Sequence, residues 1–231
     1  AALNQLCQTY WFPVYAFIRS ERIDTHHAKD LTQGFFVHLL EGNLIRQASR
    51  EKGRFRTFLL ACLGNFMKDQ WRQEKAIKRG GSVTVLSIDD ADAEEKYQQL
   101  PMIQPAPETA FDRTWAATVI EQAMRKLKQT FSDRGRLDAF EAMKGCLSGE
   151  LSPDAYPELS AKLGMSKETF EVNLTRFKKA FGAAVRNVIA GTVAPAEIND
   201  EIKYLIAAWA AYLTDLSKSG CWRRRGAQVD F

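Results

Sequence analysis

Apolar residues recur every three or four positions along most of this 231-residue chain, and that spacing constrains the fold more than any other feature. Such a period places apolar side chains on one face of an α-helix, whereas a strand would alternate every second residue. The pattern is interrupted at length once, over residues 81–112, where helical periodicity is missing and three prolines occur. The sequence therefore predicts an all-α fold of two small helical domains joined by an irregular linker.

The first domain is expected over residues 1–80. Its apolar faces recur at helical spacing, and capping residues or glycine mark the helix ends. The expected elements are a helix or helix pair at residues 3–18 that Pro13 should kink or divide, a helix from Asp24 or Thr25 to Gly42, a short helical turn at 43–48, a loop at 49–54, an apolar helical stripe from Phe55 to Trp71, and a basic, poorly buried helix end at 72–79.

Helical pattern resumes after Asp112, and the second domain is expected over residues 113–191. A C-terminal extension follows at residues 192–231. The expected elements are two helices separated near Gly135 and ended at Gly149, a short helix from the cap pair Ser152 and Pro153 through Leu163, a tight turn at 164–166, a long helix at 167–189, an amphipathic helix at 198–216, and a basic tail at 223–225.

Charge is unevenly distributed behind a net charge of +4. Residues 1–80 carry 13 Lys and Arg against 7 Asp and Glu, residues 81–112 carry 1 against 7, and residues 113–231 carry 18 against 14. Two basic blocks therefore flank an acidic one. Basic blocks favour a polyanionic partner because each neutralised phosphate releases counterions, although many solvated surfaces have a similar composition.

Other function classes leave few traces in the sequence. It has no apolar run long enough to span a membrane and no signal-peptide layout, so a cytoplasmic protein is expected. The four cysteines lack a C-x-x-C pair, and Cys7 and Cys62 fall at apolar helical positions, as reduced core thiols do. Since no H-x-x-x-H pair, phosphate-binding loop, nucleophile elbow or metal-like acidic cluster occurs in the folded segments, we expect no catalytic residue, no metal and no cofactor.

Residues 157–181 carry the pattern of a helix-turn-helix. Six apolar residues allow two short helices to share a core around Gly164: Leu159, Leu163, Met165, Phe170, Leu174 and Phe177. In a DNA-binding motif of this kind the second helix enters the major groove. From the pattern alone, an ordinary helical hairpin is an equal alternative.

Aromatic and basic residues alternate around residues 49–56. This composition suits stacking on single-stranded bases and gripping their backbone. Any one aromatic residue here is more often core than contact, and helical periodicity assigns Phe58, Phe66 and Trp71 to packing. Phe55 lies at the loop boundary, where both roles stay open.

Four short motifs of the first domain occur in a fixed order: D-L-T-Q-G-F-F at residues 30–36, G-R-F-R-T-F-L at 53–59, N-F-M-K-D-Q-W-R at 65–72 and K-R-G-G at 78–81. This order resembles region 2 of extracytoplasmic-function sigma factors of the sigma-70 family. The segment E-L-S-A-K-L-G-M-S-K-E-T-F at 158–170 resembles their region 4 helix-turn-helix. Together the resembling segments and their linker cover about residues 3–190, and the chain resembles a subgroup with a C-terminal extension.

The resemblance implies a DNA-binding subunit that gives bacterial RNA polymerase its promoter specificity for transcription initiation and has no catalysis of its own. In the family, the region 2 loop and following helix bind the non-template strand of the minus-ten element. They hold a flipped-out base, whose unstacking costs on the order of a few kcal/mol. The matching residues here are Arg50, Lys52, Arg54, Phe55, Arg56, Asn65, Asp69 and Arg72, with Lys75, Lys78 and Arg79 as phosphate contacts.

The resemblance also implies that core polymerase binds the chain through its clamp and flap. The family's D-L-T-Q helix docks on the clamp coiled coil of the largest subunit, which makes Asp30, Gln33 and Phe36 interface candidates. Region 4 would bind the minus-thirty-five element through the residues Ser166, Lys167, Glu168, Thr169, Glu171, Asn173, Arg176, Lys178 and Lys179.

One position departs from the family. Glu171 stands where the recognition helix often has a basic residue. An acid beside phosphates repels them, so Glu171 either accepts a hydrogen bond from a cytosine amine or marks a helix turned from the usual pose.

Three alternatives stay open. The family's linker threads the RNA exit path, so the acidic run at residues 89–95 either imitates nucleic acid there or is a solvated charge run. The C-terminal helix either simply packs on a domain, covers one of the two domains and regulates them, or binds a separate partner such as an anti-sigma protein or other regulator. The alternative function is a stand-alone helix-turn-helix regulator with residues 1–80 as a sensor or dimerisation domain, which tight operator binding without polymerase would favour.

Overall fold

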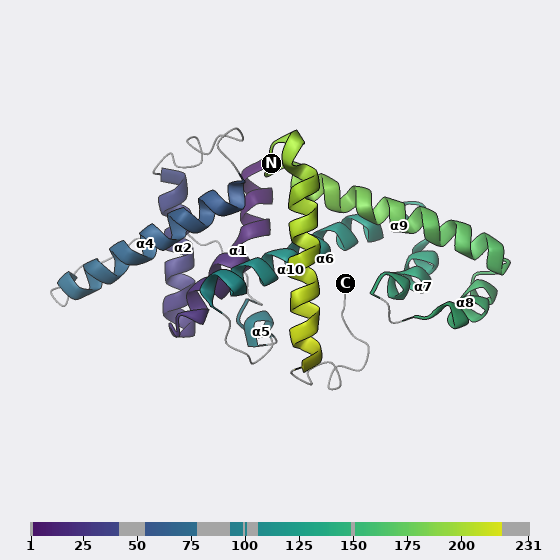
Figure 1. The fold of residues 1–231 in the computed structure, drawn as a ribbon, viewed down its shortest axis with the longest axis horizontal. Helices are drawn as coiled ribbons and strands as arrows, with labels where there is room; N and C mark the ends of the chain where they lie inside the picture. Colours follow the sequence, from purple (N-terminus) through teal and green to yellow (C-terminus); the bar gives the residue numbers. More distant parts are fainter. Residues whose placement is uncertain are drawn as a thin grey trace. The chain divides into compact units, whose positions relative to one another are not determined.

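The computed structural model describes residues 2–41, 54–77, 93–98, 100, 106–148 and 151–218. Within these ranges the chain is helical and has no strand, which confirms the expected all-α class (Figure 1). The described chain forms two compact units: unit 1 is Ala1–Thr118 with Ile189–Asp230, and unit 2 is Val119–Val188. The C-terminal helix thus belongs to the same unit as the N-terminal helices, and both unit boundaries fall inside helices rather than in the expected linker.

Unit 1 begins with three long helices, α1 (Ala2–Ser20), α2 (Thr25–Glu41) and α4 (Phe55–Ile77). Pro13 lies inside α1 and does not divide it. A proline within a helix costs about 3 kcal/mol because a backbone hydrogen bond is lost and the ring crowds the previous turn. Tyr10, Val14 and Phe17 are buried around it, and burying side chains of this size contributes about 1.5–3 kcal/mol each. Packing therefore keeps the helix continuous.

Aromatic contacts join α2 to its neighbours. Helical spacing in the sequence predicts five inward-facing residues in α2, and all are buried: Ala28, Leu31, Phe35, Phe36 and Leu39. Phe36 stacks on Trp11 of α1 with ring centroids 5.4 Å apart. Phe35 meets Phe66 of α4 edge-on at 5.6 Å. The expected cap is also confirmed, since Asp24 Oδ1 accepts a hydrogen bond from the His27 N–H at 3.1 Å.

The later elements of unit 1 correct the expected linker. A short helix, α5 (Ala93–Gln98), lies within it, and α6 (Pro107–Asp133) begins six residues before the expected start at residue 113. Pro107 is one of the three prolines that favour a linker here, but a proline in the first turn lacks only an N–H that has no helical partner there. Ala110 and Phe111 are fully buried, so apolar packing draws this turn into the unit. The unit ends with η3 (Pro195–Glu197) and α10 (Ile198–Lys218).

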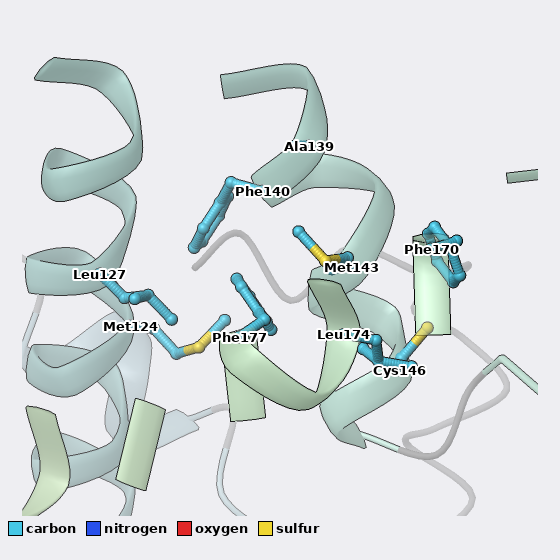
Figure 2. Packing of buried hydrophobic residues seen from close by; sticks show 9 residues of the cluster. All are labelled: Met124, Leu127, Ala139, Phe140, Met143, Cys146, Phe170, Leu174 and Phe177. Atoms are coloured by element: carbon cyan, nitrogen blue, oxygen red, sulfur yellow. The ribbon is translucent and has the colours of Figure 1, made fainter. Parts of the chain in front are cut away.

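Unit 2 is built on the second part of α6, α7 (Leu137–Ser148), η2 (Pro153–Ala155), α8 (Tyr156–Lys162) and most of α9 (Lys167–Ala190). Its core consists of Met124, Leu127, Ala139, Phe140, Met143, Cys146, Phe170, Leu174 and Phe177 (Figure 2). Phe140 of α7 and Phe177 of α9 meet edge-on with centroids 5.8 Å apart. The apolar stripe of α9 expected from the sequence therefore lies against α6 and α7.

Two glycines end helices of unit 2 in the left-handed conformation. Gly135 follows α6 and Gly164 follows α8, each with φ of +63°. At Gly164 the N–H donates to the Ala161 carbonyl at 3.0 Å, and the next N–H, of Met165, donates to the Ser160 carbonyl at 3.0 Å. This pair of bonds satisfies carbonyls that the helix end leaves free. The turn between α8 and α9 thus has the glycine-dependent geometry that the sequence predicts.

Replacing Gly164 with alanine should lower the free energy of unfolding by about 1 kcal/mol, because a Cβ is disfavoured at positive φ. The added Cβ would meet no atom within 4 Å, so the effect is one of backbone conformation alone. The matched control is Gly182→Ala inside α9, which also has open space and should raise the free energy of unfolding by about 0.5–1 kcal/mol. Urea unfolding followed by circular dichroism measures both. Equal signs for the two variants would contradict the assigned turn.

Candidate nucleic-acid interface

The strongest candidate surface lies on the helix α9, which follows α8 through the Gly164 turn. Ser166 caps α9, because its Oγ accepts a hydrogen bond from the Thr169 N–H at 3.2 Å. Phe170, Leu174 and Phe177 point into the core of unit 2 (Figure 2). With one side of α9 fixed in the core, the opposite side of its first turns faces solvent.

Nearly all the expected region 4 residues lie on that exposed side. The exposed ones are Ser166, Lys167, Glu168, Thr169, Glu171, Arg176, Lys178 and Lys179. Asn173 is half-buried, and its Nδ2 lies 3.5 Å from the Met165 sulfur. The structure therefore brings these residues onto one accessible helix surface, as the sequence pattern indicates.

Acidic and basic groups share this surface. Glu171 is exposed, and its carboxylate lies 4.0 Å from the Lys167 ammonium one turn earlier. A hydrogen bond from its own backbone N–H and another from the Ser166 side chain lower the pKa of Glu168, so this carboxylate stays ionised at the helix N-terminus. The basic residues Arg176, Lys178 and Lys179 all come later in α9.

Sequence reasoning missed Val172, whose exposed fraction of 51% is high for an aliphatic side chain. It lies beside Glu171 in the first half of α9, off the stripe formed by Phe170, Leu174 and Phe177. A valine at such a position can contact a thymine methyl group, for which apolar side chains are suited. Its departure from the apolar period is the signal that would have identified it.

A second candidate surface lies on α4. Asn65, Asp69 and Arg72 follow one another at four- and three-residue spacing, so they share one face of the helix. All three are exposed. Arg72 Nη1 contacts Asp69 Oδ1 at 3.2 Å, an exposed pair that contributes little to stability and can exchange for another partner. Three expected region 2 residues therefore form an accessible row.

The start of α4 differs from this row because Arg56 is buried, with 5% of its surface exposed. Its Nη1 contacts Asp112 of α6 at 2.7 Å, and its Nε contacts Glu201 of α10 at 3.2 Å. The guanidinium also lies over the Tyr204 ring, 3.9 Å from the centroid. Burial alone would lower the pKa of Arg56, but the two carboxylates raise it above its ordinary value. In this structure its charge is neutralised inside the protein.

Arg54 and Phe55 lie beside Arg56 and are half-buried. Arg54 Nε lies 3.2 Å from the second carboxylate oxygen of Glu201. The Phe55 ring packs edge-on against Tyr10 of α1 at 5.3 Å. Sequence reasoning had no signal for these contacts, because the partner Glu201 lies 145 residues from Arg56 along the chain.

The remaining expected region 2 residues lie outside what the structure describes. Arg50, Lys52, Lys78 and Arg79 are outside the described residues. Lys75 belongs to α4, but its side chain is likewise outside the description. The row on α4 is therefore the part of the region 2 prediction that the structure brings together.

The expected polymerase-binding residues of α2 separate into accessible and buried ones. Asp30 is exposed and Gln33 is half-buried. Phe36 is fully buried between Trp11 and Phe35. A residue that binds a partner has to be accessible. Phe36 is not accessible in this structure, because the aromatic core of unit 1 surrounds it.

Glu94 of the acidic run has partners within unit 1. Glu94 of α5 receives two hydrogen bonds from Arg19 of α1, from Nη2 at 2.8 Å and Nε at 2.9 Å, and a third from the Tyr15 hydroxyl. These hydrogen bonds lower the pKa of Glu94 to about 2, and those from Arg19 have the largest effect. Burial and the bond to Glu94 raise the pKa of Tyr15. Residues 89–92 lie outside the described part of the chain.

Other kinds of site find little support among the described residues. They contain no group of three or more His, Cys, Asp or Glu side chains able to bind a metal. Cys7, Cys62 and Cys146 are free thiols, and burial raises the pKa of each. None of the described helices is both long and apolar enough to cross a membrane.

Comparison with known proteins found no matching family model, no matching curated protein and no matching solved structure. The geometry of the two candidate surfaces and the motifs that they carry are therefore the basis for a functional proposal.

Lowering the pH should weaken the attachment of α5 to α1. Because the pKa of Glu94 is about 2 in the folded chain and 4.5 as its ordinary value, its stabilising effect is complete above about 4.5 and is lost as the pH falls from there towards 2. Urea unfolding midpoints measured between these pH values should therefore fall more steeply for the unsubstituted chain than for Glu94→Gln. An exposed carboxylate supplies a control, since Glu21→Gln should behave like the unsubstituted chain. Parallel pH profiles for all three would contradict the assigned bonds.

Proposed function

We propose that this chain is an RNA polymerase sigma factor that directs promoter recognition and transcription initiation. The observation that carries the proposal is the helix-turn-helix of α8 and α9, whose second helix presents polar and basic residues on one exposed side while its apolar side is fixed in the core. The motif order that resembles regions 2 and 4 of extracytoplasmic-function sigma factors supports the same function. In this proposal α9 reads the minus-thirty-five element.

The row of Asn65, Asp69 and Arg72 on α4 is the proposed site for the non-template strand of the minus-ten element. Amide, carboxylate and guanidinium groups together can donate to and accept from base edges and phosphates. The polar row is exposed along a helix whose opposite side is anchored by the buried Leu63 and Met67. A rigid scaffold of this kind suits capture of a base that has left the stack.

Core polymerase is the proposed partner of α2. Asp30 is the exposed residue of the D-L-T-Q motif and therefore the first interface candidate on this helix. In the proposed function the chain supplies no catalysis and needs no cofactor, because nucleotide addition belongs to the polymerase.

Transcription in vitro is the direct test of this function. Purified bacterial core polymerase, with and without the chain, is supplied with genomic DNA fragments, and RNA start sites are mapped. Start sites that appear only with the chain are the expected result. Their absence, combined with tight operator binding by the chain alone, would instead favour a stand-alone helix-turn-helix regulator.

Arg176→Ala should reduce promoter binding by the chain with core polymerase about five- to tenfold, because a base or phosphate contact from the recognition helix is lost. Arg125→Ala is the matched control. Arg125 is an exposed arginine of the same unit, on α6, where it pairs with Glu121 at 2.7 Å. Its loss should change binding less than about twofold, as expected for an exposed ion pair away from the DNA surface. Equal losses for the two variants in a filter-binding or footprinting titration would contradict the assignment of α9.

A further inference from the structure

The helix α10 buries two charged groups together with apolar ones and leaves two aliphatic side chains exposed. Its most deeply buried residues include the carboxylates of Glu201 and Asp215, with Leu205 between them. Two of its aliphatic residues face solvent, Ile206 with 62% and Leu213 with 37% of their surface exposed. Helices that pack by the hydrophobic effect alone keep their carboxylates on the solvent side. Ion pairs therefore contribute, beside apolar packing, to the contact between α10 and the rest of unit 1.

Three arginines and three carboxylates balance one another beneath α10. Glu201 pairs with Arg54 and Arg56 at 3.2 Å each. Asp215, near the other end of the helix, pairs with Arg113 of α6 at 2.5 Å. Asp112 of α6 completes the set, since it contacts Arg56 and also accepts a hydrogen bond from the Tyr204 hydroxyl at 2.5 Å. The network joins the start of α4, the start of α6 and the length of α10.

Such a network fixes geometry without adding much to stability. Desolvation of buried charges largely cancels their attraction, so a buried ion pair is often no better than apolar packing. The arginines of this network can bind a phosphate in place of a carboxylate, because a guanidinium fork suits either group and makes two parallel hydrogen bonds to it.

We propose that α10 is a removable cover over a phosphate-binding site formed by Arg54 and Arg56, and that single-stranded DNA displaces it. The inference rests on the proposed function, because the motif containing these arginines is the one that resembles the strand-binding segment of region 2. In the covered state the Glu201 carboxylate occupies the position of a backbone phosphate. In the open state Arg54 loses its carboxylate partner, Arg56 keeps only Asp112, and both bind the DNA backbone.

Neighbouring groups favour single-stranded DNA as the ligand. Phe55 lies between the two arginines in sequence and is half-buried, so the accessible part of its ring can stack on a base. The same helix continues into the exposed row of Asn65, Asp69 and Arg72. A phosphate site at the start of α4 would therefore extend a polar surface that already points to solvent.

The test compares two neighbouring carboxylates of α10. Glu201→Gln removes the buried carboxylate, whereas Asp200→Asn removes an exposed one that pairs with Lys203 at 3.0 Å. Both substitutions remove one negative charge, so any general electrostatic gain in DNA affinity is the same for the two variants. Affinity of the full chain for a fluorescent single-stranded oligonucleotide is measured by anisotropy at several salt concentrations.

Glu201→Gln should bind the oligonucleotide at least about threefold more tightly than Asp200→Asn, with a salt dependence steeper by about 0.7 for each phosphate gained. Adding Arg54→Gln to Glu201→Gln should remove most of that gain. Equal affinities and equal salt slopes for the two single variants would overturn the proposal.

A measurement on the unsubstituted chain covers the case in which Glu201→Gln fails to fold. Saturating oligonucleotide should speed hydrogen exchange at the amides of α10 and leave those of α1 unchanged. Unchanged exchange in α10 would overturn the proposal. Neither measurement needs polymerase, so the two proposals can be tested separately. Transcription without opening of α10 would contradict only the proposed cover. Opening of α10 without transcription would contradict only the proposed sigma-factor function.

Discussion

The buried guanidinium of Arg56 is the interaction on which the arrangement of unit 1 depends. It contacts Asp112 and Glu201, two carboxylates from helices that are far apart in sequence, and it lies over the ring of Tyr204. Removing one member of a buried ion pair leaves an uncompensated charge and typically costs about 3–5 kcal/mol, whereas the intact pair adds little net stability. The network therefore acts mainly by selecting one arrangement: α4, α6 and α10 meet where all these charges are paired, and other packings would leave one of them alone.

At the start of α4, the structural role of Arg56 competes with its availability to bind DNA. An arginine that holds three helices together is neutralised and dehydrated, so it is a poor ligand for DNA while the network is closed. Asn65 and Arg72 are exposed further along the same helix and take no part in this network. In the proposed function the helix thus has a permanently accessible part and a part whose use requires α10 to leave. That division lets one segment contribute to stability and to binding at different times.

Features that depend on near neighbours in sequence could be predicted, and those that depend on distant partners could not. The Asp24 cap, the Gly164 turn and the limits of α9 each follow from residues within one or two helical turns, and the structure confirms them. The start of α6 at Pro107 was placed too late because a first-turn proline and a breaking proline look alike until the burial of Phe111 is known. Periodicity marked Phe36 as inward-facing, and the motif resemblance marked it as an interface residue; only packing against Trp11 decides for the core. Nothing near Arg56 in sequence indicates Asp112 or Glu201.

The charge order along α9 bears on how strongly that helix alone could hold DNA. Acidic residues in the first turn stabilise a helix, because they interact favourably with the positive end of its dipole, so Glu168 strengthens α9 at the N-terminus. The same charges, with Glu171 one turn later, oppose an approaching phosphate. The attraction must then come from Arg176, Lys178 and Lys179, which lie further along the helix. In the proposed function, a recognition helix balanced in this way would bind weakly alone and gain affinity when a second site on the same chain is engaged, because the tether raises the effective concentration. Weak separate sites are what a promoter-reading subunit requires if it is to bind DNA only when a polymerase presents both sites together.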